Sequence, residues 1–191
     1  MEEIEKHLQE RELNKEKVAE FHTTRVMGAD TKVYLDEDKK WFIVTRFPKF
    51  AEHNPDVLEY SQVTGCELDV DEHKHEIKRK TEEGKEESYD SPRYEYSYDF
   101  NILIRVNHPW FSQIRFRVNP SSVEGRYSPD YREAERQSNE IRDTMLAMQQ
   151  KTREEIVQEQ APKKAVICPF CKASTVPDEQ GRCEYCRGPI V

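Results

Sequence analysis

Four cysteines near the C-terminus have the residue type and spacing of a metal site. They are Cys168, Cys171, Cys183 and Cys186, arranged as two C-x-x-C pairs with eleven residues between them. A C-x-x-C pair places two thiolates on one tight turn, so that both sulfurs can reach the same tetrahedral ion. Two such turns supply all four ligands and leave no open position for water, as in structural rather than catalytic zinc sites. The sequence therefore predicts one structural Zn²⁺ held by these four residues.

Two disulfides or an iron–sulfur cluster are the alternatives for the same four cysteines. A reducing cytosol favours metal binding over disulfides, because it keeps thiols free to bind metal. The charged N-terminus lacks the apolar stretch of a signal peptide, and no apolar run reaches the length of a transmembrane span. We therefore expect a cytoplasmic protein without a transmembrane segment, whose cysteines bind zinc.

The cysteine module at 165–191 is too small to fold without its metal. Five Lys or Arg and three Asp or Glu lie between Lys163 and Val191. Since four thiolates and one dication add two negative charges, the module is about neutral, and binding of nucleic acid by the ribbon is disfavoured. Its apolar side chains could form a docking patch or merely pack around the metal. They are Val166, Ile167, Phe170, Tyr185 and Ile190.

The rest of the chain contains no recognisable catalytic constellation. It lacks the nucleophile elbow G-x-S-x-G, the zinc-protease motif H-E-x-x-H, a glycine-rich phosphate loop and a dinucleotide fingerprint. We predict that the protein is not an enzyme. The net charge of -8 also disfavours binding to nucleic acid or to an anionic membrane, because both attract clustered positive charge.

Alternating apolar and polar residues between positions 31 and 118 predict an antiparallel sheet. The strongest run has Tyr94, Tyr96, Tyr98, Phe100, Ile102, Ile104 and Val106 on one parity, and strict alternation of this length indicates one face on a core. We expect further strands or hairpins at 31–46, 57–60, 66–71, 75–80 and 114–118. The break at 61–65 should separate two of them, and 75–80 should be a short edge strand.

Two helices flank the predicted sheet. A charged helix is expected over 1–21. A second, amphipathic helix is expected over 130–148, with Ser128 as its N-cap and Pro129 at its first position, and it should cover the apolar face of the sheet. The predicted organisation is an N-terminal helix at 1–21, a β domain at 22–148, a polar helical linker at 149–164 and the zinc ribbon at 165–191.

Three arginines are predicted to share the outward face of the sheet. Arg105, Arg115 and Arg117 could meet a lipid head group or an acidic partner. Alternatively, carboxylates on the facing strands, such as Glu67 and Asp99, balance them in the ordinary manner of a solvated sheet.

The chain resembles an uncharacterised bacterial family, a domain of unknown function with a pleckstrin-homology-like (PH-like) fold that is often coupled to zinc ribbons. The resemblance rests on four segments, Asn14–Phe21, Thr31–Asp38, Tyr60–Val70 and Pro92–Phe100. It implies an α+β fold in which curved antiparallel strands are closed by one C-terminal helix. The family carries no established activity to transfer.

These features together predict a non-catalytic adaptor for protein–protein interaction. PH-like folds commonly bind peptides at an exposed strand edge or beside the closing helix. The first alternative is lipid or membrane-surface binding through the three arginines, and the next is nucleic-acid binding by the ribbon. The sequence leaves the oligomeric state open, because the helix at 1–21 could pack on its own sheet or on another chain.

Overall fold

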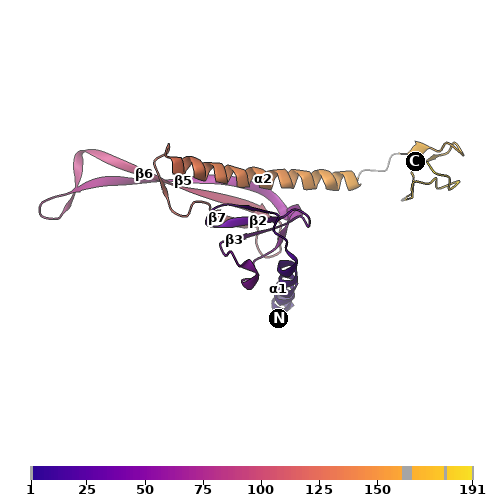
Figure 1. The fold of residues 1–191 in the computed structure, drawn as a ribbon, viewed down its shortest axis with the longest axis horizontal. Coiled ribbons are helices and arrows are strands. Elements are labelled where there is room, and N and C mark those ends of the chain that lie inside the picture. Colours follow the sequence, from indigo (N-terminus) through magenta and orange to yellow (C-terminus); the bar gives the residue numbers. More distant parts are fainter. Residues whose placement is uncertain (1, 161–164, 179, 191) are drawn as a thin grey trace. The chain divides into compact units, whose positions relative to one another are not determined.

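The computed structural model describes residues 2–160, 165–178 and 180–190. It divides into two compact units, Met1–Thr152 and Arg153–Val191. Figure 1 shows antiparallel sheets together with an N-terminal helix and a longer second helix. The predicted α+β class is therefore confirmed. Neither of the α-helices in the described ranges is long and apolar enough to cross a membrane.

The first sheet contains four antiparallel strands in the order β1-β2-β3-β4. They are β1 (Arg25–Met27), β2 (Lys32–Asp36), β3 (Trp41–Thr45) and β4 (Leu58–Glu59). The β2–β3 pair confirms the hairpin predicted at 31–46. Asp36 ends β2 with its side chain fully buried, and its carboxylate accepts the N–H groups of Lys39 and His22 at 3.0 and 2.8 Å. These bonds satisfy the buried charge and fix the hairpin turn.

Helix α1 (Glu2–Glu20) packs on the first sheet. Val18 is buried with Tyr34, Ile43 and Val57 in a small cluster of their own. Asn14 fixes the helix on the loop before β4, because its amide donates to the Pro55 carbonyl at 2.8 Å and its oxygen accepts the Val57 N–H at 2.9 Å. Thus α1 lies on its own chain, one of the two arrangements that the sequence left open.

The second sheet is dominated by a long hairpin. Strand β5 (Val63–Lys80) pairs with β6 (Glu86–Val106), which also pairs with β7 (Gln113–Arg117) and the short β8 (Val123–Glu124). The predicted break after 57–60 is present but shorter than expected, whereas the prediction of two separate strands at 66–71 and 75–80 is wrong. Residues 60–62 form a short 3₁₀ helix, η2 (Tyr60–Gln62), and a single strand then runs through all the predicted pieces. Pairing with β6 keeps this charged stretch extended, although its own residues favour strands weakly.

Helix α2 (Pro129–Gln160) covers the second sheet. The Ser128 hydroxyl accepts the Tyr131 N–H at 3.1 Å, which confirms the predicted N-cap. The helix is continuous through the predicted capping helix and the predicted linker as far as Gln160, and the rest of that linker, 161–164, lies outside the described residues. A second 3₁₀ turn, η1 (Phe50–Glu52), lies in the loop before β4.

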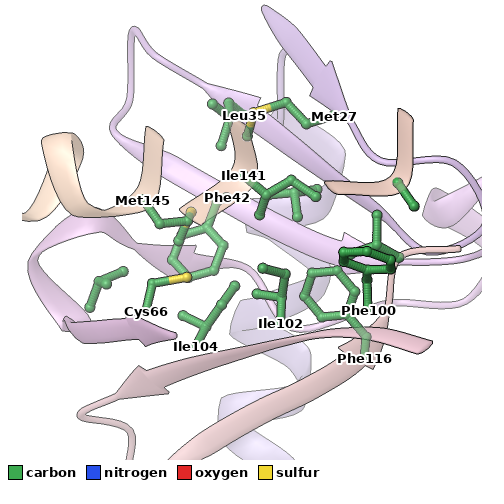
Figure 2. Packing of buried hydrophobic residues seen from close by; sticks show 14 of the residues in the cluster. Met27, Leu35, Phe42, Cys66, Phe100, Ile102, Ile104, Phe116, Ile141 and Met145 are labelled. Carbon is green, nitrogen blue, oxygen red and sulfur yellow. The ribbon is translucent and has the colours of Figure 1, made fainter. Parts of the chain in front are cut away.

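The main core lies between the two sheets and the first half of α2. Figure 2 shows Ile141 and Met145 of α2 among Phe42 of the first sheet and Cys66 and Ile104 of the second. The buried stripe of the helix consists of Tyr131, Ala134, Ser138, Ile141 and Met145. Its period of three to four residues is the one that predicted the helix from the sequence.

The prediction that Tyr94 and Tyr96 face a core is wrong. Both side chains are exposed, although the alternation continues without a break into the buried Tyr98 and Phe100. The reason is where helix α2, which covers this face of the sheet, begins. Tyr131, in the first turn of α2, packs against Tyr98 and Phe100 at centroid distances of 5.0 Å. Beyond Ser97 strand β6 pairs with β5 alone, so the last part of the hairpin is a two-stranded arm, defined here as residues 74–96.

Candidate metal centre

The first pair of cysteines lies on a tight turn, residues 168–173, that follows a short strand. This turn and its counterpart at 183–188 are called knuckles below. Strand β9 (Val166–Ile167) pairs with β10 (Ser174–Thr175), and the chain between them carries Cys168 and Cys171. The Cys168 N–H donates to the Ala173 carbonyl at 2.9 Å, and the Lys172 N–H donates to the Cys168 carbonyl at 3.0 Å. Lys172 has a φ of 59°, a left-handed conformation that closes the turn beneath the sulfurs.

The second knuckle repeats the first one bond for bond. The Cys183 N–H donates to the Gly188 carbonyl at 2.9 Å, and the Arg187 N–H donates to the Cys183 carbonyl at 2.8 Å. Arg187 has a φ of 57°, matching Lys172. The sequence carries this repeat as Cys-Pro-Phe-Cys-Lys-Ala and Cys-Glu-Tyr-Cys-Arg-Gly, each with an aromatic residue, a basic residue and a small residue in the same places. The repeat of the residues beside the cysteines was not predicted, because the prediction used the cysteine spacing alone.

The four sulfurs converge as a tetrahedral metal requires. All lie within 4.8 Å of one another, with Cys168–Cys186 at 3.5 Å and Cys171–Cys183 at 3.6 Å. Zinc–sulfur bonds of about 2.3 Å place tetrahedral sulfurs about 3.8 Å apart. A disulfide needs about 2.05 Å, so these thiols are free. The predicted ligand set therefore comes together and fits one zinc ion, and it is the one such cluster found within the described residues.

The surrounding backbone favours a thiolate at Cys168. The N–H of Cys171 and then that of Phe170 lower the pKa of the buried Cys168 thiol to about 6. At Cys171 the Ala173 N–H acts in the same direction, but burial and the neighbouring Cys183 and Cys186 outweigh it and raise the pKa to about 12. Four sulfurs this close cannot all ionise without a cation among them, and a bound dication supplies the missing charge.

The aromatic side chains of the knuckles point outward. Phe170 and Tyr185, which occupy the same place in the two repeats, are 66% and 70% exposed, and Ile167 is 71% exposed. A Cβ added to Gly188 would lie 3.0 Å from the Phe170 ring, so a larger residue here would displace this ring by a few tenths of an ångström. The sequence left two roles open for the apolar residues of this module, docking a partner and packing around the metal. The exposure of Phe170, Tyr185 and Ile167 disfavours packing for these three, whereas Val166 and Ile190 are half-buried.

The three predicted ligand-face arginines lie together on the second sheet, and each one is ion-paired. Arg105 contacts Glu67 at 3.0 Å and Arg117 contacts Asp99 at 3.4 Å. Arg115 contacts Asp69 at 3.0 Å and Asp71 at 3.4 Å. Positive and negative side chains therefore alternate across this face, the ordinary arrangement for a solvated sheet.

The fifth cysteine plays no part in the cluster. Cys66 lies on β5 inside the main core, where burial raises the pKa of its thiol to about 12. A thiol with so little thiolate at neutral pH is a poor nucleophile and a poor metal ligand.

No protein-family model matches this chain, and neither a curated protein nor a solved structure matches it. Its function is therefore inferred from the geometry described above.

Proposed function

We propose that this protein is a non-catalytic interaction adaptor, in which a PH-like β domain carries a zinc ribbon that presents apolar side chains to a protein partner. The observation that carries the proposal is the pairing of a closed four-sulfur cluster with exposed aromatics. Four thiolates leave a zinc ion no position for substrate or water, so the metal would act structurally. What the metal would hold in place is the pair of knuckles bearing Phe170 and Tyr185.

Exposed aromatic side chains favour a protein partner over the alternatives. Aromatic residues are enriched in the energetically important centres of protein interfaces, where they bury large areas. Lipid binding through the three arginines lacks comparable support, because each guanidinium already contacts a carboxylate on a neighbouring strand. The near-neutral charge of the ribbon gives no support to nucleic-acid binding. A cytoplasmic location accords with a metal site of free thiols.

The test is affinity capture with the intact protein and a double variant, Phe170→Ser with Tyr185→Ser. The expected result is loss of specifically bound protein while one zinc per chain is retained. Val157→Ser is the matched control, because Val157 is an equally exposed apolar residue outside the knuckles. Capture that is unchanged in the double variant would contradict the proposal.

A further inference from the structure

Strand β5 has a free edge along the two-stranded arm. Among the described residues it pairs with β6 alone, and the residues from Glu72 to Glu76 are all exposed. A free edge presents a row of backbone N–H and C=O groups to any further strand. Figure 1 shows the arm projecting past the other strands of its unit, so this edge is accessible over a long stretch.

The other edge of the arm is a poorer template. On β6 the register jumps between Arg93, opposite Ile77, and Ser88, opposite Lys78, so residues 89–92 bulge out of the ladder. Pro92 within this bulge has no N–H to donate. Strand β5 keeps a regular register from Gly65 to Ile77 and contains no proline.

The charges along the free edge complement those of a second copy. When two β5 strands pair antiparallel about His75, Lys74 of each copy lies opposite Glu76 of the other. The next pair outward is His73 opposite Ile77, and beyond it Glu72 lies opposite Lys78 and Asp71 lies opposite Arg79. Directly opposed residues share a face of the sheet, and opposite charges in such pairs are stabilising. The Lys74 ammonium lies 3.8 Å from the centroid of the Tyr94 ring on β6, so on dimerisation it would turn from this ring toward Glu76 of the second copy.

Neighbouring registers are repulsive. A two-fold axis between edge strands must pass through a residue, because opposed side chains have to share a face. Moving the axis to Lys74 places Glu72 opposite Glu76. Moving it to Glu76 places Lys74 opposite Lys78. An edge can be protected from pairing by a run of charges of one sign, which would repel a second copy. The alternating signs along β5 are not needed for that protection.

We propose that the protein forms a homodimer by antiparallel pairing of the free β5 edges about His75, which joins the second sheets of two copies into one continuous sheet. The occupant of the edge is a second copy of this chain. The inference does not depend on the adaptor proposal, because the arm contains none of the cysteine ligands.

The test uses sedimentation velocity of the intact, zinc-loaded protein with charge-reversal variants. The wild type should sediment as a dimer at micromolar concentration. Lys74→Glu and Glu76→Lys each turn two attractive contacts per dimer into repulsive ones, so each should weaken dimerisation by roughly tenfold to a hundredfold. Mixing the two variants should restore a dimer, because the carboxylate introduced at position 74 of one chain then meets the ammonium introduced at position 76 of the other. A misfolded arm could not be rescued in this way.

Lys85→Glu is the control, since Lys85 lies in the turn of the hairpin outside the paired segment. It should leave the dimer unchanged. A second measurement uses His75→Cys, which should form an intermolecular disulfide on mild oxidation because residues on the axis have Cα atoms about 4.5–5.5 Å apart. Glu95→Cys, opposite His75 on β6, should not. A monomeric wild type, or a dimer that neither charge reversal weakens, would overturn the proposal.

Discussion

The two units of this chain achieve stability by different physical means. The first unit buries a continuous apolar core from two sheets and a helix, including Phe42, Phe100 and Ile104 with no exposed surface. In the second unit the fully or almost fully buried side chains among the described residues are Cys168, Cys183 and Thr175. A segment with so little apolar burial cannot offset the entropy of ordering its chain. A metal ion held by the four cysteines would take the place of a core in the second unit, and we expect the two units to unfold independently.

Removing the metal should have the largest effect, and the effect should be confined to the second unit. A chelator, or Cys168→Ser, is expected to unfold the cysteine module, because structural zinc contributes about 10 kcal/mol or more to such modules. Native mass spectrometry should show one zinc per wild-type chain and none in the variant. The thermal melting of the β domain should not change. Cys66→Ser is the control, and it should retain the zinc because Cys66 lies outside the cluster. Collapse of the whole protein on chelation would refute the independence of the units.

Ile104→Asp should produce the converse result. Ile104 is fully buried, and a carboxylate at this position has no partner, so a loss of about 4 kcal/mol or more is expected and the β domain should unfold. Circular dichroism should show the loss of strands while zinc content stays at one per chain. Leu103→Asp on the same strand is the matched control, because Leu103 lies opposite Arg115 on the half-exposed face. Equal damage from both substitutions would contradict the assigned faces.

Asn119→Ala should weaken the β domain by about 2 kcal/mol, because it leaves buried backbone groups unsatisfied. Between β7 and β8, the Asn119 side chain makes hydrogen bonds to the β6 backbone of the kind that a paired strand would make. Its oxygen accepts the Phe100 N–H at 2.7 Å, and its amide donates to the Tyr98 carbonyl at 3.2 Å. Urea unfolding should report the change. Asn101→Ala is the comparison variant, since the Asn101 amide donates to the Asp71 side chain at 2.8 Å on the solvated face, and a loss below about 1 kcal/mol is expected.

The smallest effect is expected at the arginine face. Arg115→Gln should change the unfolding free energy by less than about 1 kcal/mol, because its ion pairs are half exposed and screened by solvent. Flotation with anionic vesicles should give the same result for the wild type and the variant. Binding that requires Arg115 and weakens with salt would revive the lipid alternative.

The sequence predicted the sites at which local chemistry dictates structure. The cysteine spacing predicted the ligand set, and the alternation from Tyr98 to Val106 predicted a strand with one buried face. It could not predict where the cover of that strand ends, because Tyr94 and Tyr96 have the same alternation as their buried neighbours. Their exposure depends on where α2 begins along the sheet, which is a tertiary property. The continuity of β5 was missed for a similar reason, since pairing with β6 overrides the weak strand propensity of its charged half.

The repeated knuckles have a consequence for the order in which the metal is bound. Each knuckle completes its own backbone hydrogen bonds from residues adjacent in sequence, so either one offers two sulfurs to an incoming ion before the other is in place. A bound ion would then join the two knuckles by closing the loop of eleven residues between Cys171 and Cys183. Closing a flexible loop of this length costs roughly 2 kcal/mol of chain entropy. Metal uptake would therefore pass through a state in which one knuckle alone binds the ion, and the two sulfurs of the other knuckle would then bind from within the same chain.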